Sequence, residues 1–170
     1  MKDNKIRKLV FAALFAALTC VATMVIEIPI PATGGYVHPG DAVVLLSAFL
    51  LGPWWGAAAA GVGSGLADLL AGYALYVPGT FIIKFLVALV AGAILSAKFI
   101  KNDALRAAVA GVVGEAVMVL GYFVYEAFIL KYGAVVALGS VVANCLQGAF
   151  GVIVGVLLYL ALKKVKYFNN

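Results

Sequence analysis

The chain has 170 residues, of which 66% are hydrophobic and 11% are charged, and its mean hydropathy is +1.15. Because soluble domains carry about 25% charged residues, this composition excludes a soluble enzyme and indicates an integral membrane protein. The formal net charge of +5 comes from local basic clusters, so it does not indicate nucleic-acid binding. We expect a single transmembrane domain over residues 1–170, with no room for a soluble ATPase.

Apolar runs cover most of the chain, and a membrane-spanning helix needs about 20 residues. The sequence has five apolar runs. Basic clusters lie before the first run, between the third and fourth, and after the last, and all three favour the cytoplasmic side. Five single crossings cannot place all three clusters on that side. The second run must therefore enter and leave on one side, and Gly52-Pro53 marks its break. The sequence predicts an all-α bundle of six transmembrane helices with both termini cytoplasmic, at about residues 6–26, 40–52, 54–71, 78–97, 104–130 and 133–163.

The first predicted helix carries small residues four positions apart in two registers, Ala12/Ala16 and Ala13/Ala17. Positions i and i+4 share a helix face, and small residues there let another helix approach closely in lipid. The pattern predicts either a docking surface for a partner or ordinary packing inside the bundle.

Two connections on the outer side of the predicted bundle are candidates for ligand contact. Residues 27–40 form a loop interrupted by Pro and Gly, with no helical period, and loops of this length are often lids. The connection over residues 72–77 offers Tyr73 and Tyr76.

Ionisable and amide side chains gather in the outer half of the predicted bundle. Such groups are costly at membrane depth and usually face a cavity or a partner. This layering predicts a pocket that opens to the outside and is closed towards the cytoplasm. The polar positions are His38, Asp41, Asp68, Lys84, Glu115, Tyr122, Glu126, Asn144 and Gln147.

Several of these positions also have a structural explanation. Lys84 could form an ion pair with Asp68 or Glu115, and Asp41 could cap the helix that begins beside it. The lone His38 could be solvated on its loop, while Glu126 could lie at the interface near residue 131.

No catalytic arrangement is visible in the sequence. It has no zinc-protease motif, phosphate-binding loop or cofactor fingerprint, and its one histidine lies in a loop. Cys20 and Cys145 fall in apolar runs without metal-binding spacing, so we interpret them as inert thiols. We expect neither a cofactor nor a bound metal, and no enzymatic activity.

The six short helices, the paired small residues and the polar outer layer together resemble the S component, the substrate-binding membrane subunit, of energy-coupling factor (ECF) vitamin transporters. The residues that carry this resemblance are Gly35–Ala42, Leu51-Gly52-Pro53, Gly65–Leu69 and Asn144-xx-Gln147-Gly148. They are similar to the branch typified by riboflavin, hydroxymethylpyrimidine and pyridoxine carriers.

The resemblance implies a multi-pass protein of a prokaryotic plasma membrane that works with a membrane-embedded T component and two cytoplasmic ATPase subunits. It assigns docking of the T component to Ala12, Ala13, Ala16 and Ala17. It also implies that the vitamin contacts come from the first and third outer connections and the last three helices. Carried over by position, these contacts are Tyr36, His38, Tyr73, Tyr76, Lys84, Glu115, Tyr122, Asn144 and Gln147.

The predicted pocket suits a small heteroaromatic ligand with hydroxyl or amine groups. A pyridoxine-like or hydroxymethylpyrimidine-like vitamin is the first hypothesis, and riboflavin is the second. A self-sufficient carrier that uses Glu115 and Asp68 as a proton relay is the alternative from another class, although the chain shows no inverted repeat.

Overall fold

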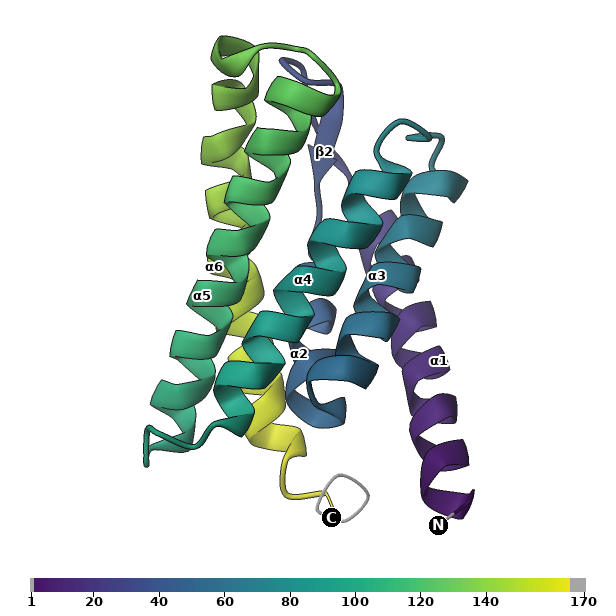
Figure 1. Ribbon diagram of the computed structural model, residues 1–170, viewed down its shortest axis with the longest axis vertical. Helices are drawn as coiled ribbons and strands as arrows, with labels where there is room; N and C mark the ends of the chain where they lie inside the picture. The colour runs from purple at the N-terminus through teal and green to yellow at the C-terminus, as the bar shows by residue number, and fades with distance from the viewer. Residues whose placement is uncertain (1, 166–170) are drawn as a thin grey trace.

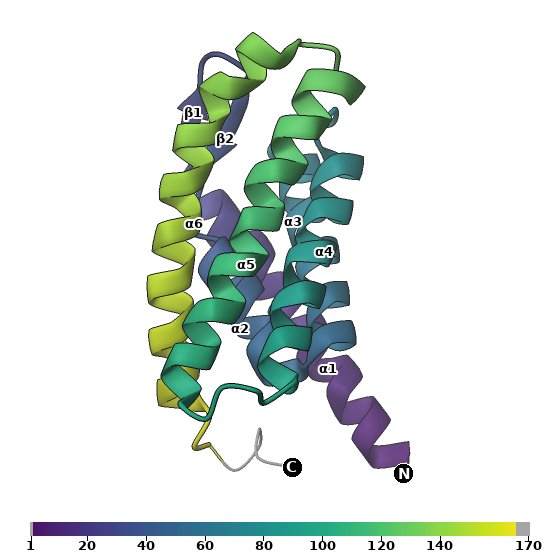
Figure 2. The ribbon, with the colours of Figure 1, turned by 60° about the vertical axis from the view of Figure 1, so that its left-hand side comes forward.

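The computed structural model describes residues 2–165, and the side chains of residues 5–165. Six α-helices form a bundle in which successive helices run in opposite directions (Figures 1 and 2). A two-stranded antiparallel hairpin follows the first helix, and a short π-helix extends the fifth. The elements are α1 (Lys2–Val25), β1 (Ile28–Ile30), β2 (Gly35–Val37), α2 (Asp41–Leu51), α3 (Pro53–Leu70), α4 (Val77–Ser96), α5 (Asp103–Val124), η1 (Tyr125–Ile129) and α6 (Ala134–Leu162).

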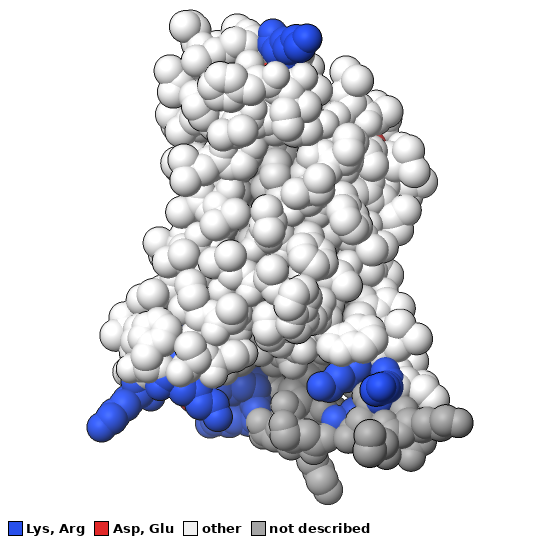
Figure 3. Space-filling model, in the orientation of Figure 1, with Lys and Arg blue, Asp and Glu red and all other residues white. Residues whose placement is uncertain are grey.

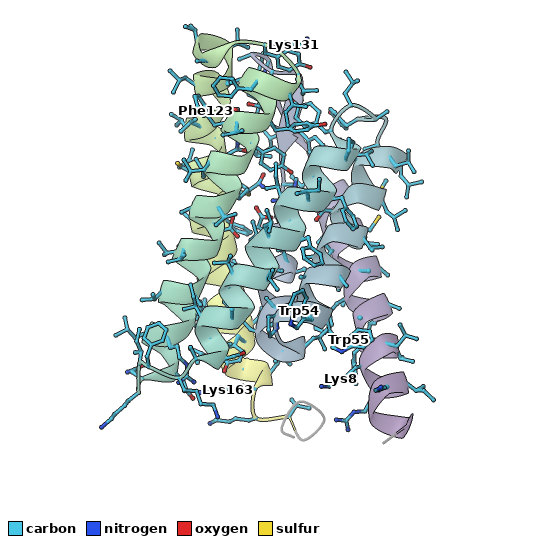
Figure 4. The ribbon with its side chains drawn as sticks, viewed as in Figure 1. Lys8, Trp54, Trp55, Phe123, Lys131 and Lys163 are labelled. Atoms are coloured by element: carbon cyan, nitrogen blue, oxygen red, sulfur yellow. The ribbon has the colours of Figure 1, made fainter. Side chains whose placement is uncertain are left out.

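The six predicted helices are all present, close to their expected ranges. The break between α2 and α3 lies at Gly52, whose φ of 80° favours glycine, and Pro53 occupies the first turn of α3. Trp54 and Trp55 lie at the same end of the bundle as Lys8 and Lys163 (Figure 4). Tryptophan is typical of the membrane interface, so the α2–α3 turn lies at one membrane boundary.

Four segments are long and apolar enough to cross a membrane: Lys5–Val25, Val77–Ser96, Asp103–Ile129 and Ala134–Leu162. The protein is therefore an integral membrane protein, as predicted. The prediction of six spans is modified at α2, whose 11 residues extend about 16 Å, roughly half of a hydrocarbon core. Helix α3 returns from the turn with 18 residues rich in Gly and Ala.

The β1–β2 hairpin fills the space above the short helix α2 (Figure 1). Its register pairs Ile28 with Val37 and Ile30 with Gly35. Irregular backbone is tolerated at membrane depth where protein surrounds it or a cavity adjoins it, and here Ile30, Gly35 and Tyr36 of the hairpin line a cavity. The sequence predicted a lid over residues 27–40 but did not predict strands. We call residues 27–40 the lid.

Basic side chains gather at the end of the bundle where α1 begins and α6 ends (Figure 3). Lys131 lies at the opposite end, and on the face that Figure 3 shows, the band between the two ends carries almost no charge. This distribution is the one that a positive-inside membrane protein has.

Candidate functional site

The floor of the site is a buried ion pair between helices α2 and α4. The Lys84 ammonium donates to Asp41 Oδ1, and both side chains are 0% exposed. Gln147 of α6 donates from Nε2 to Asp41 Oδ2 at 2.6 Å, and Lys84 also approaches the sulfur of Met118 at 2.9 Å. We call Asp41, Lys84 and Gln147 the polar floor. The buried Asp41 carboxylate therefore has two hydrogen-bonding partners, which offset the cost of removing its charge from water.

The partner of Lys84 differs from the two that the sequence indicated. Asp68 and Glu115 were the expected partners, but Asp41 holds the lysine. The reason is the length of α2. Because this helix begins part-way down the bundle, its first residue reaches the level of Lys84. Asp41 is also not the cap of α2, a position that Gly40 occupies.

The lid is tied to the floor and to the walls. The backbone N–H of His38 donates to Gln147 Oε1 at 2.8 Å, and the Tyr36 hydroxyl donates to Asp68 Oδ1 at 2.7 Å. The Tyr76 hydroxyl donates to the Thr33 carbonyl at 3.0 Å. The alternative that His38 is solvated is wrong, since it is buried with 8% exposure.

The walls carry two carboxylates. Asp68 of α3 is buried, and its Oδ2 has no hydrogen-bond partner among the described residues. Glu126 of η1 accepts from Ser140, and its Oε1 lies 3.2 Å from the Tyr76 hydroxyl. Glu126 is therefore not at the interface near Lys131 but inside the protein, 2% exposed.

A small cavity lies between the lid, the walls and the floor. Its volume is about 20 Å³, about the space of one water molecule. The Asn144 side chain of α6 is buried and lines this cavity, and no described residue hydrogen-bonds to it. The lining residues are Ile30, Gly35, Tyr36, His38, Asp68, Tyr76, Thr80, Tyr122, Glu126, Asn144 and Gln147.

Six of the nine vitamin-contact residues named from the resemblance line this cavity: Tyr36, His38, Tyr76, Tyr122, Asn144 and Gln147. The other three lie outside the lining. Tyr73 packs on the Tyr36 ring with centroids 4.4 Å apart, and Lys84 lies in the floor. Glu115 is buried against Gly148, and neither of its carboxylate oxygens has a partner in the described part of the chain.

Asp68, Glu126 and Thr80 line the cavity although they were not among those nine residues. The sequence analysis counted the first two among the polar positions of the outer layer, with Asp68 as a possible partner of Lys84 or part of a proton relay and Glu126 as a possible interface residue. Thr80 lies one turn before Lys84 on α4, so the 3.6-residue period offered a signal. Its hydroxyl is 2.9 Å from the Tyr122 hydroxyl. Gly35 and Ile30 gave no signal, because their positions follow from the hairpin register.

The small residues of α1 divide between two faces. Ala12 is buried in the bundle, and the backbone of Ala16 packs so closely on Gly63 that a Cβ there would lie 2.4 Å from the Ala16 carbonyl oxygen. Ala13 and Ala17 are exposed. One register therefore packs α1 on α3, and the other remains available to a partner.

The buried His38 gives a pH-dependent prediction. Burial, with a smaller contribution from the charge of Lys84, lowers the pKa of its imidazole to about 3, whereas an unfolded histidine has a pKa of about 6.5. Below pH 6.5 the imidazole is therefore protonated in the unfolded state but stays neutral in the folded state. We expect this residue alone to cost about 2 kcal/mol of unfolding free energy between pH 7 and pH 5.

The measurement is equilibrium unfolding in mixed detergent micelles at the two pH values, comparing the wild type with His38→Asn. Asparagine retains an acceptor near the position of Nδ1, which accepts from the Gly40 N–H at 3.1 Å, but it does not titrate. Parallel pH dependence in the two proteins would show that His38 is not held neutral.

The structure is thus a membrane-embedded helical bundle with a small polar-lined cavity beneath its lid. The chain belongs to the family of S components of ECF-type riboflavin transporters, whose model matches residues 3–164. It is the substrate-binding subunit of a vitamin transporter and not an enzyme. S components of this kind bind a vitamin and work with a membrane T component and ATPases.

Two further similarities agree with this assignment. A Pyrococcus woesei protein described as an uncharacterized protein in gap 3′ region is 40% identical over 144 residues, which cover 85% of this chain and 93% of the relative. The crystal structure of the S component for biotin from an ECF-type ABC transporter superposes with a TM-score of 0.71. That match covers 99% of this chain and 96% of the other at 17% identity, so it shows the shared fold alone.

Proposed function

We propose that this S component binds a one-ring heteroaromatic vitamin, pyridoxine-like or hydroxymethylpyrimidine-like, in the cavity beneath the lid. The observation that carries the proposal is Asp68 Oδ2, a buried carboxylate oxygen without a hydrogen-bond partner among the described residues, in a cavity that the buried Asn144 also lines. Buried polar groups are normally hydrogen-bonded, so both are suited to a ligand. Tyr36, Tyr76 and Tyr122 around them offer ring surfaces for stacking.

The small cavity favours a small ligand. A ligand must displace part of the lid, because the present volume is about 20 Å³. A single ring requires less displacement than the three fused rings of riboflavin. Riboflavin is the second candidate, and the description of the matching family favours it.

We further propose that the basic end of the bundle faces the cytoplasm and that the lid faces the outside. The T component and two ATPase subunits then supply the work of transport, with docking on the small-residue face of α1. In this orientation the vitamin enters past the lid. Membership of the S-component family favours this assisted mechanism over a proton relay through Glu115 and Asp68.

The direct test is equilibrium binding of pyridoxine, hydroxymethylpyrimidine and riboflavin to the purified full chain in nanodiscs. Native mass spectrometry of the same preparation would identify a vitamin that remains bound through purification. Tight binding of a one-ring vitamin supports the first proposal. Binding of riboflavin alone selects the second candidate, and absence of binding by all three contradicts both.

Asn144→Ala tests the site residue that has no structural partner. We expect affinity for the bound vitamin to fall by about 1–3 kcal/mol, which is roughly 5- to 150-fold, because a ligand group loses its hydrogen bond. Stability without ligand should change little, since the described structure shows no hydrogen bond to this amide. Isothermal titration and ligand-free melting temperature measure the two effects. Unchanged affinity would remove Asn144 from the site.

A further inference from the structure

An apolar groove lies between α4 and α5 in the half of the bundle nearest the lid, and we call it the α4–α5 groove. Its volume is about 630 Å³, and it shares no lining residue with the cavity beneath the lid. Its base is buried, whereas its sides are aliphatic side chains that are 57–65% exposed. Gly79, Ile83 and Tyr125 belong to the base, and Ile82, Leu120 and Ile129 belong to the sides.

The length of the groove matches one leaflet of a bilayer. Along α5 and η1 the lining extends from Val117 to Ile129, which is about 18 Å at the helical rise per residue. One leaflet supplies about half of the hydrocarbon core, roughly 15 Å. The groove therefore extends from the end of the bundle that carries the lid to the middle of the membrane.

The shape of the groove suits a hydrocarbon chain better than a helix. Close packing of two helices in lipid requires small residues at the surface, but both glycines of the groove are already packed. A Cβ at Gly79 would lie 2.5 Å from the Tyr125 ring, and a Cβ at Gly121 would lie 3.0 Å from Ile83. Bulky aliphatic side chains stand on both sides instead. They keep a second helix at a distance and leave room for one flexible chain.

A positive charge lies at the end of the groove nearest the lid. Lys131 follows the lining residue Ile129 by two positions, its side chain is exposed, and the described residues form no ion pair with it. It is the only lysine or arginine in the three connections at this end of the bundle, residues 26–40, 71–76 and 130–133 (Figure 4). A lysine at a membrane surface attracts anionic headgroups.

We propose that the α4–α5 groove binds an anionic phospholipid of the leaflet on the lid side, with one hydrocarbon chain in the groove and the phosphate headgroup at Lys131. The groove holds the chain by apolar contact, which any lipid can supply. The lysine selects the headgroup, because it favours a net negative charge. This site is separate from the vitamin cavity, so the inference does not depend on the proposed function.

Quenching of a single tryptophan by brominated lipid locates the bound chain, because bromine quenches only at close range. Trp54 and Trp55 are replaced by phenylalanine, and Leu120→Trp places a reporter on one side of the groove. The full chain is reconstituted in equimolar phosphatidylglycerol and phosphatidylcholine, with bromine on the chains of one lipid or the other. We expect phosphatidylglycerol to occupy the groove at least threefold more often, and we expect Lys131→Gln to remove this preference.

Two matched controls accompany the experiment. Val142→Trp places the reporter on α6, where Val142 is 68% exposed, against 65% for Leu120, and lies outside the groove and the cavity. We expect this reporter to show no lipid preference. Lys101→Gln removes an exposed lysine in the connection between α4 and α5, at the other end of the bundle. It should leave the preference in the groove unchanged.

Equal occupancy of the groove by the two lipids overturns the proposal, and so does a preference that survives Lys131→Gln. The same preference at the Val142→Trp reporter also overturns it, because general attraction to the protein then explains the result. Native mass spectrometry of the wild-type chain from the same lipid mixture needs no reporter. We expect one phosphatidylglycerol to remain bound and Lys131→Gln to lose it, whereas retention of neither lipid, or of both equally, contradicts the proposal.

Discussion

Replacing Lys84 with methionine should lower the unfolding free energy of the ligand-free protein by about 3–5 kcal/mol, the cost of removing one partner from a buried ion pair. Methionine keeps much of the length and volume of the lysine side chain, so the lost charge dominates the effect. Asp41 would retain Gln147 as a partner, at 2.6 Å, but a neutral amide does not balance a carboxylate. Equilibrium unfolding in mixed micelles measures the change.

The chain offers a matched control for this experiment. Lys163 also pairs with an aspartate, Asp103, but the two side chains are 26% and 44% exposed. Exposed pairs contribute little to stability because water and salt screen their charges, so Lys163→Met should have a small effect. The double variant Lys84→Met, Asp41→Asn should recover part of the loss, because it removes the stranded charge as well.

The same variant separates the two sequence-based interpretations of Lys84. If the lysine contacts the vitamin, Lys84→Met weakens affinity while ligand-free stability stays near that of the wild type. If the lysine belongs to the polar floor, Lys84→Met lowers the unfolding free energy of the ligand-free protein. A normal melting temperature with lost affinity would restore the interpretation of Lys84 as a ligand contact.

The helices could be predicted because their signals are local. Apolar runs, basic clusters and the Gly52-Pro53 break lie directly in the sequence and place all six helices. The depth at which α2 begins could not be read in this way, since it depends on how far the lid descends into the bundle. That depth decides that Asp41, and neither Asp68 nor Glu115, pairs with Lys84.

The site was predicted as a layer but not as a set of contacts. Intramembrane polar residues indicate a cavity because each needs a partner, and this argument grouped Tyr122, Asn144 and Gln147, which line one cavity in the structure. It could not rank two buried carboxylates, because the sequence does not show which acid already has a donor. The alternative that Glu126 lies at the interface stayed open for this reason, and the structure places Glu126 inside, within hydrogen-bond distance of Tyr76 and Ser140.

Replacing Ala13 or Ala17 with tryptophan should lower vitamin uptake at least tenfold and leave vitamin binding unchanged. The physical reason is the close approach that small side chains permit between helices in lipid. Both alanines are exposed, so a bulky residue there disturbs a partner and not the bundle. Ala12 and Ala16 are unsuitable positions for this test, because the α1–α3 contact already uses them and a large side chain would disrupt the fold.

The control is Leu18→Trp, on the other flank of the lipid-facing side of α1. Leu18 is 46% exposed and about 100° around the helix from Ala17, so this variant places the same tryptophan side chain away from the small-residue face. Uptake is measured in cells that also produce the T component and the ATPases, and binding is measured on purified protein. The docking proposal requires that Ala13→Trp and Ala17→Trp lose uptake, retain binding and differ from Leu18→Trp. Normal uptake in both alanine variants would show that the T component docks elsewhere, and equal loss of binding and uptake would mean that the substitutions damage the site.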